Sequence, residues 1–212
     1  MNSFDAFATE LRRLVPFRIR YKDEAWEMYL LNLAVVWFCP GFMTRFTTVI
    51  GSTIYFPSRQ DSQQHPQAAM RTLAHEAVHL LDAERVGLPW FMLGYLFPQV
   101  LTLGVFSFPW LGAWAFLFLL FALPWPAPFR FLFESRAYAL SYLTLPAIQR
   151  PYTLANICHH FDSWDYYRMY PFPAQVEAQV RHWAAQAEQG QDKDLLKVLL
   201  IYEMAAEVGD NF

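Results

Sequence analysis

Residues 72–81 read Thr-Leu-Ala-His-Glu-Ala-Val-His-Leu-Leu, and this stretch says most about the fold and the chemistry of the chain. Residues four apart share one face of an α-helix, so His75 and His79 lie about 6 Å apart along the axis and can bind one ion. Glu76 projects beside that ion, where it can take a proton from an activated water. The spacing predicts a catalytic zinc site, against the alternative of an amphipathic helix that carries two histidines by chance.

The helix that carries this motif has clear start and stop signals. Pro66 suits a first helical position, residues 66–86 contain no breaker, and Gly87 precedes Leu88-Pro89. Asp82 lies seven residues after His75 on the same face, but its short side chain begins about a turn beyond His79. We therefore expect Asp82 to support the site or face solvent, and expect the third ligand to come from farther along the chain.

Glu134 is the candidate third ligand, within Phe131-Leu132-Phe133-Glu134-Ser135-Arg136, a segment that reads as a mostly buried helix. A buried carboxylate is costly unless it is paired or bound to a metal. The alternative is an ion pair with Arg130 or Arg136. Two histidines and one glutamate would hold one Zn²⁺ and leave its fourth position open, as catalytic zinc sites do.

The pattern His75-Glu76-x-x-His79 with a downstream Glu134-x-x-Ala137 resembles the gluzincin metallopeptidases. The apolar insertion between the two halves resembles the membrane gluzincins of the HtpX and CAAX prenyl protease type. The resemblance covers about residues 44–145 and implies a zincin-like α+β fold, mostly α with a small β-sheet, whose edge strand binds substrate. Tyr138 stands where the family has an aspartate that holds a zinc histidine, so Tyr138 or Asp82 would take that role.

No charged residue lies between Arg85 and Arg130, and this length fits two membrane spans of about 20 residues. Pro109 divides the segment into predicted spans 87–107 and 110–126, a transmembrane helical hairpin between the two zinc-ligand helices. The alternative is a hairpin buried in a soluble core. An even number of crossings keeps the three ligands on one side, and the flanking arginines favour a catalytic part that faces the cytoplasm.

The composition fits a protein that lies partly in lipid, with 55% hydrophobic and 17% charged residues. The net charge of −3 argues against nucleic-acid binding. We expect a single catalytic domain in three parts: 1–86 with the motif helix, 87–127 with the hairpin, and 128–212 with the third-ligand helix.

The remaining segments supply further expected elements. The uncharged run 28–44 is short for a span and favours a buried or interfacial helix. Residues 45–57 are β-rich with a turn at Gly51, and predict either the substrate-binding edge strand or a core hairpin. Residues 58–67 read as a loop. The other expected helices cover 2–14, 23–38, 153–162, 173–189 and 193–207.

Peptide hydrolysis at zinc also needs a donor for the oxyanion. The candidates are Tyr138, His159, His160, Tyr166, Tyr167 and Arg168, and the sequence does not choose among them. The predicted function is a membrane-embedded, zinc-dependent endopeptidase with Glu76 as general base, acting on peptides or membrane proteins near the bilayer. The alternatives are an inactive zinc-binding scaffold and a soluble minimal gluzincin whose hairpin serves oligomerisation. The oligomeric state stays open.

Overall fold

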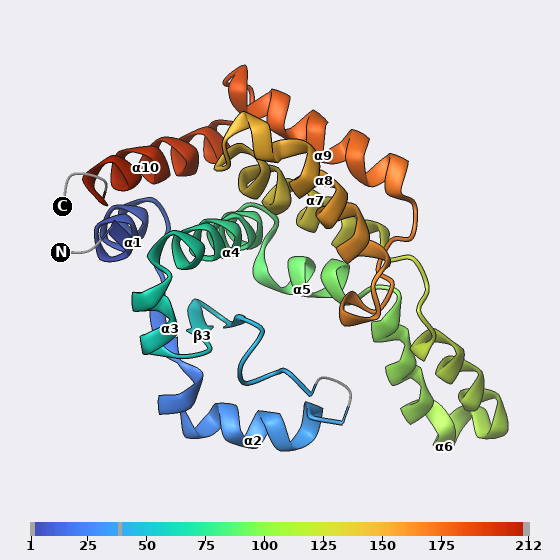
Figure 1. The fold of residues 1–212 in the computed structure, drawn as a ribbon. Helices are drawn as coiled ribbons and strands as arrows, with labels where there is room; N and C mark the ends of the chain where they lie inside the picture. Colours follow the sequence, from blue (N-terminus) through green and yellow to red (C-terminus); the bar gives the residue numbers. More distant parts are fainter. Residues whose placement is uncertain (1–2, 38–39, 210–212) are drawn as a thin grey trace. The chain divides into compact units, whose positions relative to one another are not determined.

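The computed structural model describes residues 3–37 and 40–209, and Figure 1 shows a mostly helical chain with one small sheet. This confirms the predicted fold class in its coarse form. The chain forms two compact units, one from Met1–Leu81 with Asp192–Phe212 and the other from Asp82–Gln191. The division falls inside helix α4, which runs without interruption from Pro66 to Val86 as predicted.

The sheet of the first unit has three strands in the order β1-β3-β2. Strand β3 (Thr53–Phe56) is central, antiparallel to β2 (Thr48–Ile50) and parallel to β1 (Arg18–Tyr21). Gly51 turns β2 into β3 with φ +60°, a conformation that glycine adopts without strain. The β-rich segment 45–57 is therefore a hairpin with β2 at the sheet edge. The sequence reading missed β1.

Helices α1 (Ser3–Leu14) and α10 (Lys193–Gly209) lie side by side in the first unit, although they are far apart in the sequence (Figure 1). Phe4, Phe7 and Leu11 recur at helical spacing and are buried. The rings of Phe7 and Tyr202 meet edge to face at 5.7 Å. Both predicted helices are confirmed.

Two other segments of this unit differ from expectation. Helix α3 (Arg59–Gln64) forms where a loop was predicted, because Ser58 accepts a hydrogen bond from the Asp61 amide at 3.1 Å and caps it. Helix α2 (Trp26–Val35) is shorter than predicted, about 15 Å, and cannot cross a bilayer alone. Met28 is its one buried residue, and Leu31 and Val35 are partly buried against the same core cluster. The choice between a buried and an interfacial helix for residues 28–44 stays open, and residues 38–39 of that run lie outside the described residues.

The second unit packs three helices, α7 (Pro128–Leu143), α8 (Arg150–Asp162) and α9 (Pro173–Glu188), against one another. Helix α5 (Leu88–Leu96) packs on α7, where the rings of Phe91 and Phe133 lie 4.7 Å apart. Short 3-10 turns complete the described elements: η1 (Lys22–Glu24), η4 (Ala147–Gln149) and η5 (Trp164–Tyr166).

The apolar segment forms two 3-10 arms, η2 (Gln99–Ser107) and η3 (Gly112–Ala122), joined by α6 (Phe108–Leu111). Of the described residues, the stretch Gln99–Ala122 alone is long and apolar enough to cross a membrane. The chain turns back at Gly112 with φ +53°, and the two arms lie against each other (Figure 1). The predicted span 87–107 is not one helix, because Pro98 lacks the amide hydrogen that would continue α5. Membrane insertion stays a prediction.

Candidate metal centre

The two motif histidines face the same way on α4, as their spacing requires. The centroids of the His75 and His79 rings lie 4.9 Å apart, with the ring planes nearly perpendicular at 83°. His79 is buried, while His75 and Glu76 are half-buried. The position of the pair in the middle of an uninterrupted helix fixes its geometry.

Glu134 is buried on α7, with 2% of its surface exposed. One nitrogen from each of His75 and His79 and one carboxylate oxygen of Glu134 lie within 4.8 Å of one another, so this group can hold a metal ion. At a tetrahedral zinc ion, two atoms bound at about 2.1 Å are about 3.4 Å apart. A separation of up to 4.8 Å would therefore close by up to about 1.4 Å on binding, through movement of the side chains. The donor set fits zinc.

Tyr95 on α5 is a site residue that the sequence reading missed. Its hydroxyl donates a hydrogen bond to Oε1 of Glu134. Such a bond orients a metal-binding carboxylate and fixes which oxygen faces the ion. Tyr95 lies within the uncharged segment, in the stretch 87–107 that was predicted to span the membrane. The contact of α5 with α7 is what brings it to Glu134.

Arg130 lies beside the carboxylate of Glu134. It precedes Glu134 by four residues and so shares its face of α7. The guanidinium stacks over the ring of Tyr95 at 4.9 Å and over that of Tyr166 at 5.8 Å. Burial opposes its charge, but its interactions with Tyr95 and Glu134 prevail and raise the pKa of Arg130. Arg130 therefore stays cationic and favours the ionised carboxylate that a metal needs.

Tyr138 continues the same face one turn beyond Glu134 and is bonded to another oxyanion candidate. Its hydroxyl and that of Tyr166 lie 2.7 Å apart, and either can donate. The ring of His160 lies 5.4 Å from that of Tyr166. Burial is the main cause that raises the pKa of Tyr138 well above 10, so this hydroxyl remains a donor at neutral pH.

Asp82 and Arg136 form a buried ion pair between α4 and α7. Arg136 Nη1 donates to Asp82 Oδ1 at 2.5 Å, and both side chains are more than nine-tenths buried. Arg136 was one alternative partner for Glu134, and the pair gives it a different acceptor. A hydrogen bond from the ring N–H of a zinc histidine to Asp82 or Tyr138 stays a prediction.

The other oxyanion candidates lie in other surroundings. Tyr167 donates its hydroxyl hydrogen to the carbonyl of Ala122, at the end of η3. Arg168 pairs with Asp162 at 3.0 Å. His159 is exposed on α8. The structure therefore gathers Tyr138, Tyr166 and His160 into one cluster and leaves these three outside it.

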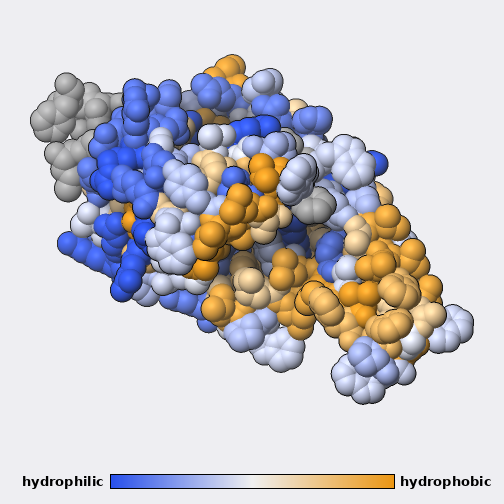
Figure 2. Space-filling view, turned by 90° about the horizontal axis from the view of Figure 1, so that it is seen from below, coloured by the Kyte–Doolittle hydropathy of each residue, from blue (hydrophilic) through white to orange (hydrophobic). Residues whose placement is uncertain are grey.

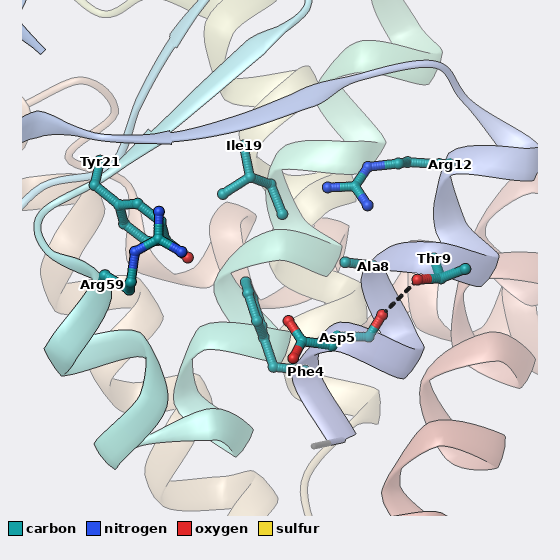
Figure 3. Close-up of a pocket in the computed structure, with 8 residues that line it drawn as sticks. All are labelled: Phe4, Asp5, Ala8, Thr9, Arg12, Ile19, Tyr21 and Arg59. Carbon is teal, nitrogen blue, oxygen red and sulfur yellow. Dashed lines mark hydrogen bonds between the residues drawn. The ribbon is translucent and has the colours of Figure 1, made fainter. Parts of the chain in front are cut away.

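A separate cavity of about 230 Å³ lies in the first unit and contains none of the predicted site residues (Figure 3). Arg12 and Arg59 point toward it from different elements, and Thr9 donates to the carbonyl of Asp5 at 2.8 Å. Arg59 stacks on Tyr21 at 4.6 Å and is held by Glu24 at 3.1 Å, so its guanidinium already has partners.

Two imidazoles, a buried carboxylate and a neighbouring half-buried glutamate form a donor set suited to metal-assisted hydrolysis. The adjacent hydroxyls of Tyr138 and Tyr166 add hydrogen-bond donors to the same face of α7. Comparison of the chain with family models, with curated proteins and with solved structures gives no match.

Proposed function

We propose that this protein is a zinc-dependent endopeptidase that acts at a membrane. The observation that carries the proposal is the group of His75, His79 and Glu134, whose ligand atoms lie within 4.8 Å of one another. Glu76 follows His75 directly and is half-buried rather than sealed in the core. This is the order and exposure that a general base beside an activated water needs.

Each residue of the site has a definite role in the proposed reaction. When bound, zinc would polarise the scissile carbonyl and lower the pKa of a water to about 7. Glu76 takes a proton from that water and passes it to the leaving amine. Tyr95 and Arg130 hold Glu134 as an oriented carboxylate. Tyr166, paired with Tyr138, donates to the oxyanion.

The apolar hairpin supports a membrane-bound location and therefore substrates near the bilayer. The chain carries no charge from residue 86 to residue 129, and most side chains of η3 are exposed. Exposed apolar surface of this extent is typical of proteins that meet lipid or a partner. Membrane proteins or hydrophobic peptides with unfolded segments are the expected substrates, and the cytoplasmic face is the expected side.

Cleavage of an unfolded protein by the detergent-purified, zinc-loaded protein tests the proposal. Glu76→Gln should retain zinc and lower kcat about 10²- to 10⁴-fold, because it removes the base and leaves the three ligands. Glu84→Gln is the matched control, since Glu84 is exposed on the same helix. Removal of zinc by a chelator should abolish cleavage, and re-addition should restore it.

Two outcomes point to the alternatives. Stoichiometric zinc without cleavage, under every substrate tried, would indicate a zinc-binding scaffold rather than an enzyme. Full solubility without detergent would indicate a soluble peptidase whose hairpin serves self-association. Equal cleavage by Glu76→Gln and the wild type would remove the proposed mechanism.

A further inference from the structure

The hairpin of η2, α6 and η3 exposes most of its apolar side chains. Along η3 the covered positions are Ala115, Phe118 and Phe121, spaced by three residues as a 3-10 helix requires. Phe118 faces η2, because a Cβ added to Gly104 would lie 2.3 Å from its ring. The other residues of η3 are exposed, including Trp114 at 75%. About one third of the residues of η3 are covered, and the other two thirds are exposed.

The other parts of the hairpin also expose apolar side chains, although most residues of η2 are half-buried. Leu103 and Phe106 on η2 are 60% and 73% exposed, and Trp110 on α6 is 83% exposed. Figure 2 shows hydrophobic side chains over the hairpin, at the right of the view. A helix that is apolar all round suits lipid, whereas a folded protein partner would cover only one face. The structure therefore points to a lipid bilayer as the partner of this hairpin.

Three polar side chains at the hairpin find acceptors within the chain, whereas the buried hydroxyl of Thr102 on η2 has no hydrogen-bond partner among the described residues. Ser107 Oγ donates to the carbonyl of Gly104 at 2.6 Å. At the open end, Trp125 Nε1 donates to the carbonyl of Leu120 at 2.8 Å, and Gln99 Nε2 donates to that of Trp125 at 3.2 Å. Polar hydrogens that find acceptors within the chain lower the cost of entering hydrocarbon.

The length of the arms limits how deep the hairpin reaches. With a rise of about 2.0 Å per residue, the nine residues of η2 span about 18 Å and the eleven of η3 about 22 Å. The hydrocarbon core is about 30 Å thick, and one leaflet with its headgroups is about 20 to 22 Å. Each arm is too short to cross the core, and each matches one leaflet.

We infer that the hairpin enters one leaflet of the bilayer and returns to the same side without crossing. This inference rests on the membrane association in the proposed function and is independent of the metal. It replaces the two predicted crossings with none, which equally keeps the three metal ligands on one side. Arg85 and Arg130, at the two ends of the uncharged segment, would lie at the same headgroup layer.

Trp110 on α6 distinguishes this arrangement from a crossing hairpin. In a crossing hairpin its position meets water or headgroups on the far side, whereas in a one-leaflet hairpin it lies within hydrocarbon. The test uses the full chain with Cys39 and Cys158 replaced by serine and a single cysteine introduced as Trp110→Cys. A charged, membrane-impermeant maleimide is applied to sealed vesicles of both orientations. Ala178→Cys, at an exposed position of α9, reports the near side.

We expect Ala178→Cys to be labelled from one side and Trp110→Cys from neither side until detergent is added. Labelling of Trp110→Cys from the side opposite Ala178→Cys would overturn the inference and restore a crossing hairpin. Labelling from the same side without detergent would show that the hairpin is not inserted, and would overturn the inference together with membrane association. Pro109→Cys, at the exposed residue that divides the two predicted spans, gives the same reading should Trp110→Cys fail to accumulate. Peptidase activity is measured separately, so loss of the proposed enzyme function is distinguishable.

Discussion

Tyr95 donates its hydroxyl hydrogen to Oε1 of Glu134, across 39 residues of sequence that contain the whole apolar hairpin. The carboxylate is 2% exposed, so an acceptor there needs partners that the protein itself provides. This hydrogen bond connects α5 to α7 at Glu134, the expected third metal ligand.

Tyr95→Phe removes this hydrogen bond and keeps the ring. We expect zinc affinity to fall about 10- to 100-fold, because hydrogen bonds to a ligand carboxylate orient it for the metal. Competition with a chelator of known affinity measures the change. Tyr152→Phe, at a tyrosine of α8 that is 74% exposed, should leave the affinity unchanged. Equal affinities of Tyr95→Phe and the wild type would indicate that Glu134 does not bind the metal.

Removal of one partner of the buried ion pair of Asp82 and Arg136 should destabilise the protein, because the other charge would then be buried without a partner. Arg136→Met leaves a carboxylate buried in apolar surroundings, and we expect a loss of about 3–5 kcal/mol in the free energy of unfolding. The double variant Asp82→Leu with Arg136→Met removes both charges and should recover much of that loss. Denaturant unfolding in detergent measures both. Equal stability of Arg136→Met and the wild type would contradict the assignment of a buried pair.

Tyr166 and its neighbour Tyr167 give a matched pair for the oxyanion assignment. Tyr166→Phe removes a donor beside Tyr138 and should lower kcat about 10²- to 10³-fold while KM and zinc content change little. Tyr167 bonds to the Ala122 carbonyl at the hairpin, so Tyr167→Phe should keep kcat near the wild-type value. If Tyr138→Phe alone lowers kcat, the donor is Tyr138 rather than Tyr166.

Gly104 is the residue that lets the two arms of the hairpin meet. In Gly104→Ala the added Cβ would lie 2.3 Å from the ring of Phe118, so the arms must separate. We expect a loss of about 1–3 kcal/mol in stability and faster proteolysis within residues 99–122. Gly94→Ala is the control, because its Cβ would meet Phe129 at 3.4 Å and alanine favours the helix. Identical proteolysis of both variants would argue against packing of η2 on η3.

The sequence predicted those elements whose signals are local. Helix α4 begins at Pro66 and ends before Gly87, whose φ of +91° suits glycine. Helix α9 likewise begins at Pro173. In contrast, β1 has only four residues with alternating arginines, and it is a strand because it pairs with β3, more than thirty residues later. No pattern within residues 18–21 carries that information.

The same distinction applies to the site. The spacing of His75, Glu76 and His79 defines their geometry within one helix, so the sequence alone could predict it. Tyr95 could not be predicted, because its role depends on the packing of α5 against α7. The pairing of Arg136 with Asp82 was not predicted either, because the sequence offered Arg136 only as an alternative partner of Glu134 and the pairing depends on the packing of α4 against α7.

The pairing of α1 with α10 has a consequence for how the chain matures. The ring of Phe7 packs against that of Tyr202, so the first unit cannot complete its core until residue 202 has left the ribosome. The second unit is continuous in sequence and can fold earlier. During synthesis the amino-terminal segment would therefore stay incompletely packed while the second unit folds, and the core of the first unit would close after that of the second.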